Sequence, residues 1–201
     1  MPNFKDEQIS VETNPQDLLA LLAHVWRAAT RVRGIDPDVV TTYFVVVGHR
    51  KRVTPPLPDT YLGNASSSVP AKARARELAE NGLGWAAWQL NQAVASKSED
   101  ATRRHLEEWV KKPEFTTKQK LSGPILITGS SPRFDVYGND FGWGPPAMVR
   151  SGDGNKVDGK VTVYVGSEGE GSMDLEICLS AMALGALMED AEFMEAVGTK
   201  N

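Results

Sequence analysis

The sequence contains few residues of the kinds used in metal and redox chemistry. Its 201 residues include one cysteine and three histidines, which excludes an internal disulfide and a cysteine-rich zinc site. No run approaches about 18 uninterrupted apolar residues, so a membrane span is not expected. Twenty-two Lys and Arg against 26 Asp and Glu give a formal charge of −4, which offers little support for binding nucleic acid or anionic lipid. We therefore expect a cytoplasmic protein with neither a nucleic-acid nor a membrane partner.

The remaining composition is typical of a globular domain. Apolar residues make up 41% of the chain and glycine adds 18 residues, which is enough for a sizeable core at this length. Residues 1–14 are polar and show no apolar period, so we expect an exposed lead-in, the remnant of a linker. Residues 15–201 are then expected to form one domain.

Apolar residues at three- and four-residue steps predict helices in several parts of the chain. The first begins at Pro15, carries Leu18, Leu22 and Val25 on one stripe, and ends near Gly34. The other expected helices cover residues 71–96 with a break near residue 82, the residues that follow Ser98, and the chain from about residue 182.

Short β-branched and alternating runs predict strands between these helices. They cover residues 41–47, 61–69, 124–128, 161–165 and 173–179. In the last, Met173, Leu175 and Ile177 alternate with polar residues, and Cys178 falls on the polar face. The fold class predicted is an α/β (α+β) two-layer sandwich with a mixed, largely antiparallel sheet and flanking helices.

No catalytic side chain or metal site is visible in the sequence. His24, His49 and His105 have no second histidine or carboxylate at metal-ligand spacing, so we expect no metal site and interpret them as structural or solvated. Cys178 has no adjacent base that would activate a thiolate.

One pentapeptide has a definite physical interpretation. It comprises Asp140, Phe141, Gly142, Trp143 and Gly144. The glycines on either side of Trp143 allow a tight backbone path. If Asp140 is buried beside the two aromatic rings it needs a cationic partner, and Arg50 and Arg52 are the natural candidates. On this interpretation the motif is structural.

The sequence D-F-G-W-G is also a signature of the plant BAHD (HXXXD-type) acyltransferases, and three other segments agree in order. Residues 49–64 resemble the family's R-x-R, PPLP and Y-F-G-N segment, with Leu62 in place of Phe. Residues 129–144 resemble its G-S-S-P-R-F-x-x-Y-G-N-D-F-G-W-G pattern, and residues 171–176 resemble its G-S-[MV]-D-[LV]-E strand. The resemblance extends from the first helix to the C-terminus.

This resemblance implies a transferase with acyl-CoA as co-substrate, no bound cofactor, and a small-molecule alcohol or amine of plant secondary metabolism as acceptor. It implies one half of a chloramphenicol-acetyltransferase-like fold, with Asp140 paired to Arg50 or Arg52. Other residues fall where the family lines its substrate channels. These are Gly63 and Asn64 near coenzyme A, and Ser130 and Ser131 near the acceptor.

The family's general base has no counterpart in the sequence. None of the three histidines is followed four residues later by aspartate, and the family enzymes are about twice as long. We therefore expect the C-terminal half of such an enzyme, inactive until an N-terminal acyltransferase domain supplies the H-x-x-x-D histidine. A stand-alone acyl-CoA-binding, metabolite-binding or interaction protein derived from the family is the alternative. A self-sufficient hydrolase or transferase using Cys178 or His49 is a third. The acyl donor, the acceptor, the origin of the chain and its oligomeric state stay open.

Overall fold

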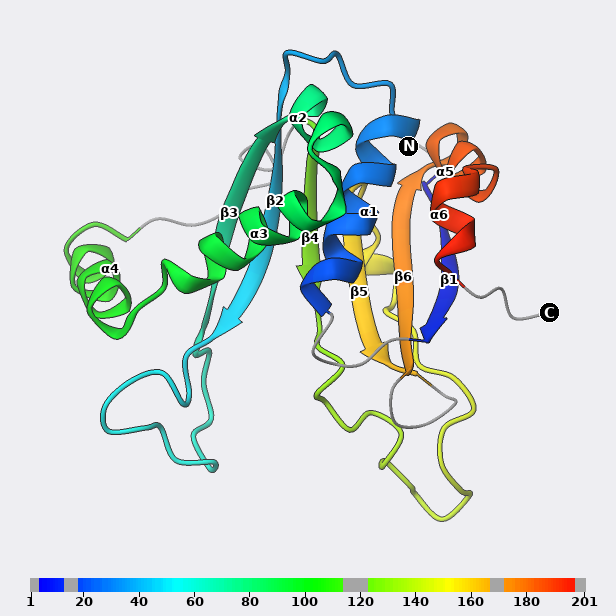
Figure 1. Cartoon of the computed structure of the whole chain (residues 1–201). Coiled ribbons are helices and arrows are strands. Elements are labelled where there is room, and N and C mark those ends of the chain that lie inside the picture. The colour runs from blue at the N-terminus through cyan, green and yellow to red at the C-terminus, as the bar shows by residue number, and fades with distance from the viewer. Residues whose placement is uncertain (1–3, 13–17, 114–122, 167–171, 198–201) are drawn as a thin grey trace.

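The computed structural model describes residues 4–12, 18–113, 123–166 and 172–197 (Figure 1). Its elements are, in chain order, β1 (Phe4–Glu12), α1 (Leu18–Val32), β2 (Val40–Gly48), β3 (Ser66–Arg74), α2 (Ala75–Glu80), α3 (Gly82–Ala95), α4 (Glu99–Lys111), β4 (Ile125–Gly129), a 3-10 turn η3 (Asp153–Asn155), β5 (Lys160–Val165), β6 (Ser172–Ser180), α5 (Ala181–Met188) and α6 (Ala191–Glu195). The expected start of the first helix at Pro15 lies outside the described residues.

The strands form one six-stranded sheet in the order β1-β6-β5-β4-β2-β3. β4 pairs parallel with both of its neighbours, and the other three pairs are antiparallel. The predicted mixed, largely antiparallel sheet is therefore confirmed, including the β5–β6 pair.

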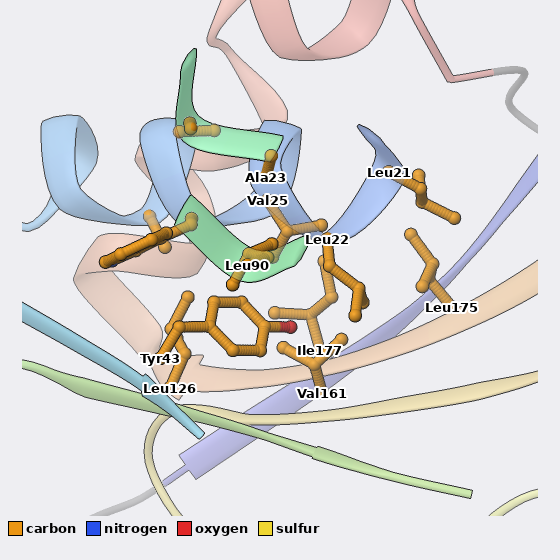
Figure 2. Packing of buried hydrophobic residues seen from close by; sticks show 14 of the residues in the cluster. Leu21, Leu22, Ala23, Val25, Tyr43, Leu90, Leu126, Val161, Leu175 and Ile177 are labelled. Carbon is orange, nitrogen blue, oxygen red and sulfur yellow. The ribbon is translucent and has the colours of Figure 1, made fainter. Parts of the chain in front are cut away.

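The core lies between this sheet and the helices that cover one of its faces (Figures 1 and 2). Leu22, Val25 and Trp26 of α1 are almost completely buried. They meet Tyr43 of β2 and Ile177 of β6. The three-four spacing that predicted α1 thus marks its core-facing stripe. None of the helices in the described ranges is long and apolar enough to cross a membrane.

Residues 4–12, which the sequence predicted as an exposed lead-in, have regular structure. They form β1, which pairs with β6 along its whole length, from Phe4 opposite Ser180 to Glu12 opposite Ser172. An edge strand is held by backbone hydrogen bonds, so it needs no strong apolar period. The division of the chain at residue 14 remains a prediction.

The helix expected from residue 71 begins later. β3 continues to Arg74, and its Val69, Ala71 and Ala73 alternate into the core. The alanines of this segment favoured a helix in the sequence analysis. In the structure every second residue is buried, which is the period of a strand. The predicted break near Gly82 is confirmed, because α2 ends at Glu80 and Gly82 has a positive φ of 77°.

β6 is buried on both faces, although its alternating pattern predicted one polar, exposed face. Every residue from Ser172 to Leu179 is buried, including Asp174, Glu176 and Cys178. β6 lies inside the sheet between β1 and β5. Its second face is covered in part by the segment that leads into β5, which contacts Glu176.

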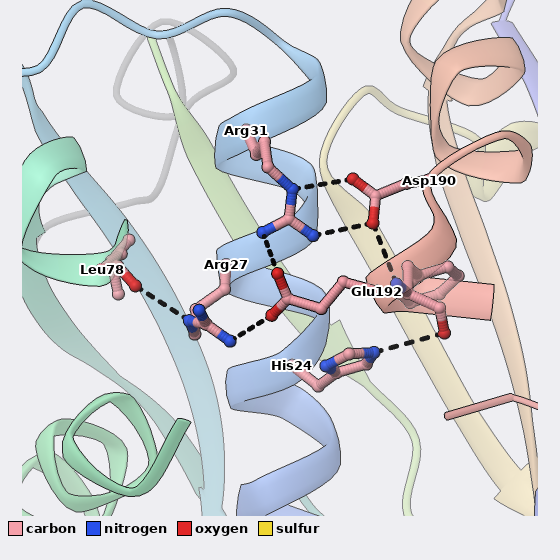
Figure 3. Close-up of polar contacts among 7 residues, drawn as sticks. His24, Arg27, Arg31, Leu78, Asp190 and Glu192 are labelled. Atoms are coloured by element: carbon pink, nitrogen blue, oxygen red, sulfur yellow. Dashed lines mark hydrogen bonds and ion pairs between the residues drawn. The ribbon is translucent and has the colours of Figure 1, made fainter. Parts of the chain in front are cut away.

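Polar contacts fasten α6 to α1 (Figure 3). Arg31 donates two hydrogen bonds, of 2.7 and 2.8 Å, to the carboxylate of Asp190, and Arg27 and Arg31 both pair with Glu192. The hydrogen bond from Arg31 is the main reason that the pKa of Asp190 lies below its usual value. His24 stacks on Phe193 with 5.2 Å between ring centroids. These contacts join the C-terminal helix to α1.

Candidate functional site

Two loops that carry the predicted substrate-lining residues leave the sheet at the same end. β2 and β4 are parallel neighbours, so their C-terminal ends lie at one edge of the sheet. The 49–65 loop follows β2, and the 130–159 segment follows β4. Both project beyond this edge (Figure 1). The topology thus brings the Gly63–Asn64 and Ser130–Ser131 pairs to a common side of the domain.

The 49–65 loop is organised around the side chain of Arg50. Its guanidinium donates hydrogen bonds to the carbonyl oxygens of Tyr61, at 2.9 Å, and Gly63, at 3.4 Å. It also lies over the Tyr61 ring, 5.5 Å from the centroid, a cation–π arrangement. A Cβ atom on Gly63 would stand 2.7 Å from the Tyr61 hydroxyl, so a larger residue at this position would displace the Tyr61 ring. Arg50 therefore sets the path of the backbone at Gly63.

Asn64 directs the chain from this loop into β3. Its Oδ1 accepts hydrogen bonds from the Ser66 N–H, at 3.1 Å, and the Ser66 hydroxyl, at 2.8 Å. The other polar atoms of the side chain are the amide N–H groups, which are hydrogen-bond donors.

The two serines after β4 lie at a sharp change of direction. Ser130 has a φ of +64°, a left-handed conformation that few non-glycine residues adopt. The hydroxyl of Ser131 accepts a hydrogen bond of 3.3 Å from the backbone N–H of Arg133, a side-chain contact that stabilises the turn. Backbone conformations of this kind recur at functional sites.

The Asp140–Gly144 motif forms a self-contained turn. Asp140 Oδ1 accepts hydrogen bonds from the N–H groups of Gly142, at 2.7 Å, and Gly144, at 3.0 Å. Both glycines have a positive φ, 98° and 93°, as the tight backbone path predicted.

The pairing predicted for Asp140 is not formed in this structure. Asp140 is exposed, and no ion pair joins it to Arg50 or Arg52 among the described residues. The prediction was conditional on burial of the carboxylate beside the aromatic rings, but the side chains of Phe141 and Trp143 are themselves 82% and 93% exposed. An exposed carboxylate is solvated by water and needs no cation.

A buried carboxylate that the sequence analysis did not single out holds the 130–159 segment on the sheet. Glu176 of β6 accepts hydrogen bonds from the Ser151 N–H, at 3.2 Å, and from the Ser151 hydroxyl. Lys156 pairs with it at 2.9 Å. Burial and the Glu176 charge together raise the pKa of Tyr164 on β5. The alternation along β6 gave no sign of this cluster, because it placed Glu176 on a solvent face.

The histidines and the cysteine occupy structural positions. His24 and His49 are buried and bonded to a carbonyl oxygen and to hydroxyl groups, respectively. His105 is exposed on α4, and Cys178 is buried in β6. Among the residues that the structure describes, no three His, Cys, Asp or Glu side chains gather in a way that could hold a metal ion.

Sequence comparison places relatives along almost the whole chain. A model of the Transferase family matches residues 4–194. An uncharacterized acetyltransferase of Arabidopsis thaliana is 36% identical over 184 residues, which cover 90% of this chain and 41% of that protein. The BAHD acyltransferase DCR of the same plant is 35% identical over 175 residues, which cover 87% and 36% of the two chains. The chain therefore spans less than half the length of these relatives.

Solved structures share the fold. The TRI101 protein of F. graminearum, complexed with coenzyme A and deoxynivalenol, superimposes with a TM-score of 0.81 at 17% identity over 98% of this chain and 49% of that one. Vinorine synthase superimposes with a TM-score of 0.71 at 15% identity over 100% and 50%. At these identities the similarity shows a common architecture, covering about half of each solved chain.

Proposed function

The chain belongs to the transferase family that contains the plant BAHD acyltransferases, and on this premise we propose that it is the C-terminal domain of an acyl-CoA-dependent acyltransferase. The match over residues 4–194 carries this proposal. The shared position of Gly63, Asn64, Ser130 and Ser131 at one end of the sheet supports it. We propose that the protein is cytoplasmic. Its single cysteine cannot form an internal disulfide, which agrees with a reducing compartment.

The reaction proposed joins an acyl group to an alcohol or amine. The acceptor oxygen or nitrogen attacks the thioester carbonyl, the C–S bond breaks, and coenzyme A leaves as the thiol. A general base must take the acceptor proton, a contribution of about 10²–10⁴ in rate. None of the three histidines of this chain has the family's H-x-x-x-D context. We therefore propose that the base comes from an N-terminal acyltransferase domain and that this chain alone is inactive.

The residues of this chain have binding and positioning roles in the proposal. The Asn64 amide and the Gly63 backbone face the coenzyme A side of the cleft, and the two serines line the acceptor side. TRI101, a structural neighbour, is complexed with coenzyme A together with T-2 or with deoxynivalenol, which supports a cleft that receives coenzyme A and a second small molecule.

Complementation tests the proposal. The purified chain is mixed with the separately expressed N-terminal half of an Arabidopsis relative, and release of the coenzyme A thiol is followed with a panel of acyl-CoA donors and alcohol acceptors. We expect turnover from the mixture and none from either half. The matched control is an N-terminal half in which the H-x-x-x-D histidine is alanine. Turnover by the unaided chain would overturn the proposal. Binding of coenzyme A without complementation would favour a stand-alone acyl-CoA-binding protein.

A further inference from the structure

Helix α4 is attached to the domain by polar contacts. It lies beyond the β3 edge of the sheet (Figure 1), and Thr102 is its buried residue. Its apolar Leu106 and Val110 are 55% and 74% exposed, so they add little packing energy in this structure. The first turn of α4 makes polar contacts that reach the 49–65 loop.

Glu99, at the start of α4, holds the middle of that loop. Its Oε1 accepts a hydrogen bond of 3.0 Å from the Thr54 N–H, and its Oε2 accepts one of 2.9 Å from the Thr54 hydroxyl. Arg103, one turn further along α4, pairs with the same carboxylate at 3.0 Å. The hydrogen bonds from Thr54 and Arg103 lower the pKa of Glu99, so the carboxylate is ionised and accepts all of these bonds near neutral pH.

His49 holds the base of the loop. One ring nitrogen lies 2.8 Å from the Ser67 hydroxyl of β3, and the other lies 3.5 Å from the Thr102 hydroxyl of α4. The His49 N–H donates to the Ala65 carbonyl at 2.7 Å, which closes the two ends of the loop against each other. The imidazole thus connects α4 with the strand on which the loop returns.

These contacts continue to the proposed coenzyme A side of the site. Arg50 follows His49 in the chain, and its guanidinium bonds the carbonyl oxygens of Tyr61 and Gly63. A shift of the segment between residues 49 and 54 therefore moves the Arg50 guanidinium, which bonds the Gly63 carbonyl oxygen. Helix α4 thus contacts the loop at Thr54 and His49. The side chain of Arg50 then connects this part of the loop with Gly63.

We propose that α4 positions the 49–65 loop, with Glu99 acting through Thr54 and Thr102 acting through His49, and so determines where Gly63 and Asn64 lie for coenzyme A. Glu99 and Thr102 are positioning residues and contact no substrate. The choice of coenzyme A as the ligand rests on the proposed function, whereas the positioning of the loop stands on the contacts alone.

A pair of neighbouring carboxylates provides the test. Glu99→Ala removes the acceptor of Thr54. Asp100→Ala removes the next carboxylate in the same turn of α4, an exposed side chain, and so reproduces the change in helix charge. Hydrogen exchange is measured on peptides that cover residues 50–65, and binding of coenzyme A to the full chain is measured by calorimetry. A thermal melt of each variant verifies the fold.

We expect exchange across the loop to become about tenfold faster in Glu99→Ala, as for loss of a charged hydrogen-bond acceptor, and to stay at the wild-type rate in Asp100→Ala. Coenzyme A affinity should fall in Glu99→Ala alone. Unchanged exchange in Glu99→Ala would overturn the positioning role. Faster exchange with unchanged affinity would overturn the connection to the ligand. If the wild-type chain binds no coenzyme A, the connection to this ligand fails, while the exchange rates still decide whether α4 positions the loop and complementation still decides the proposed function.

Discussion

At the scale of single residues, the Asp140 carboxylate orders its own turn by accepting the N–H groups of Gly142 and Gly144. Because Asp140 is exposed, water can replace much of what Asp140→Ala removes. We expect this variant to lose about 1 kcal/mol of unfolding free energy in the isolated chain, measured by urea denaturation. A loss near 3–5 kcal/mol would instead indicate a buried ion pair with an arginine and would contradict the exposed turn.

Glu176 is the opposite case, because its carboxylate is buried while it accepts from Ser151 and pairs with Lys156. Glu176→Gln removes the charge and one acceptor oxygen from a site that water cannot refill. The expected loss is about 3 kcal/mol of unfolding free energy, measured by urea denaturation.

The matched control for this prediction is Glu192→Gln. Glu192 also pairs with basic side chains, Arg27 and Arg31, but its own side chain is 48% exposed. An exposed ion pair contributes about 1 kcal/mol or less, so the same substitution should cost much less there. Equal losses at the two positions would show that burial of Glu176 is not what makes its contacts matter.

The sequence predicts backbone geometry at a residue better than it predicts the residue's partner. The two glycines around Trp143 indicated a tight turn, and both have the positive φ that such a turn uses. The pairing of Asp140 with Arg50 or Arg52 is not seen among the described residues and stays a prediction, because the partner of a carboxylate depends on which donors the fold brings near it. The Thr54–Glu99 contact joins residues 45 positions apart, and no local pattern in the chain indicates it.

At the scale of elements, α4 contacts His49, a histidine whose pKa lies below the usual value. Burial lowers the pKa of His49, and the nearby positive charges of Lys97, Arg52 and His105 lower it further. The unfolded chain, with a histidine pKa of about 6.5, therefore binds a proton at a pH where the folded chain does not. The unfolding free energy must then fall as the pH drops below about 6.5, until the lower pKa of the folded state is passed.

We expect this loss when unfolding in urea is compared at pH 7.5 and at pH 5.5. His49→Gln, which removes the titrating group, should reduce the difference between the two values. The matched control is His105→Gln, which removes an exposed histidine from α4 and should leave most of the pH dependence in place. A wild-type free energy that rises toward pH 5.5 would contradict the sign of the pKa shift.

Elements with a strong apolar period were predicted well, and those held by backbone pairing were not. The three-four stripe of α1 and the alternation of β5 are local properties, and both elements formed where they were expected, although β5 is buried on both faces. β1 was missed, because an edge strand can be polar, and the burial of both faces of β6 was missed, because it depends on strands and a segment from elsewhere in the chain. Where the local pattern was weak, contacts with distant parts of the chain therefore determined whether a strand formed and which of its faces were buried.

At the scale of the whole molecule, the sequence predicted the layer architecture correctly, since two packed layers follow from a mixed set of amphipathic helices and strands. The position of the candidate ligand residues also follows from topology, because the parallel pair β2 and β4 brings two loops to one edge. The orientation of Gly63 could not be predicted in the same way, since it depends on hydrogen bonds that the Arg50 side chain makes to residues 11 and 13 positions further along the 49–65 loop.

The chain as a whole leaves several large apolar side chains of the two loops in water. They are Leu62, Phe134, Phe141, Trp143 and Met148, each between 58% and 101% exposed. Exposed apolar surface favours association, and the proposed function supplies a second domain to contact this end of the molecule. We therefore expect the isolated chain to associate as its concentration rises in sedimentation velocity, and to form a one-to-one complex once the N-terminal half is added.

Trp143 reports whether this end of the molecule becomes covered. Its exposed indole should emit at shorter wavelength when the N-terminal half binds, and subtraction of the spectrum of Trp143→Phe isolates its signal from the other four tryptophans. If the 130–159 segment contacts the added half, that difference spectrum shifts to the blue as the complex forms. The opposite outcome is a chain that sediments as a monomer at every concentration and whose Trp143 emission does not shift when the N-terminal half is added. Such a chain would have a surface adapted to water. Its exposed loops would then belong to a stand-alone binding protein.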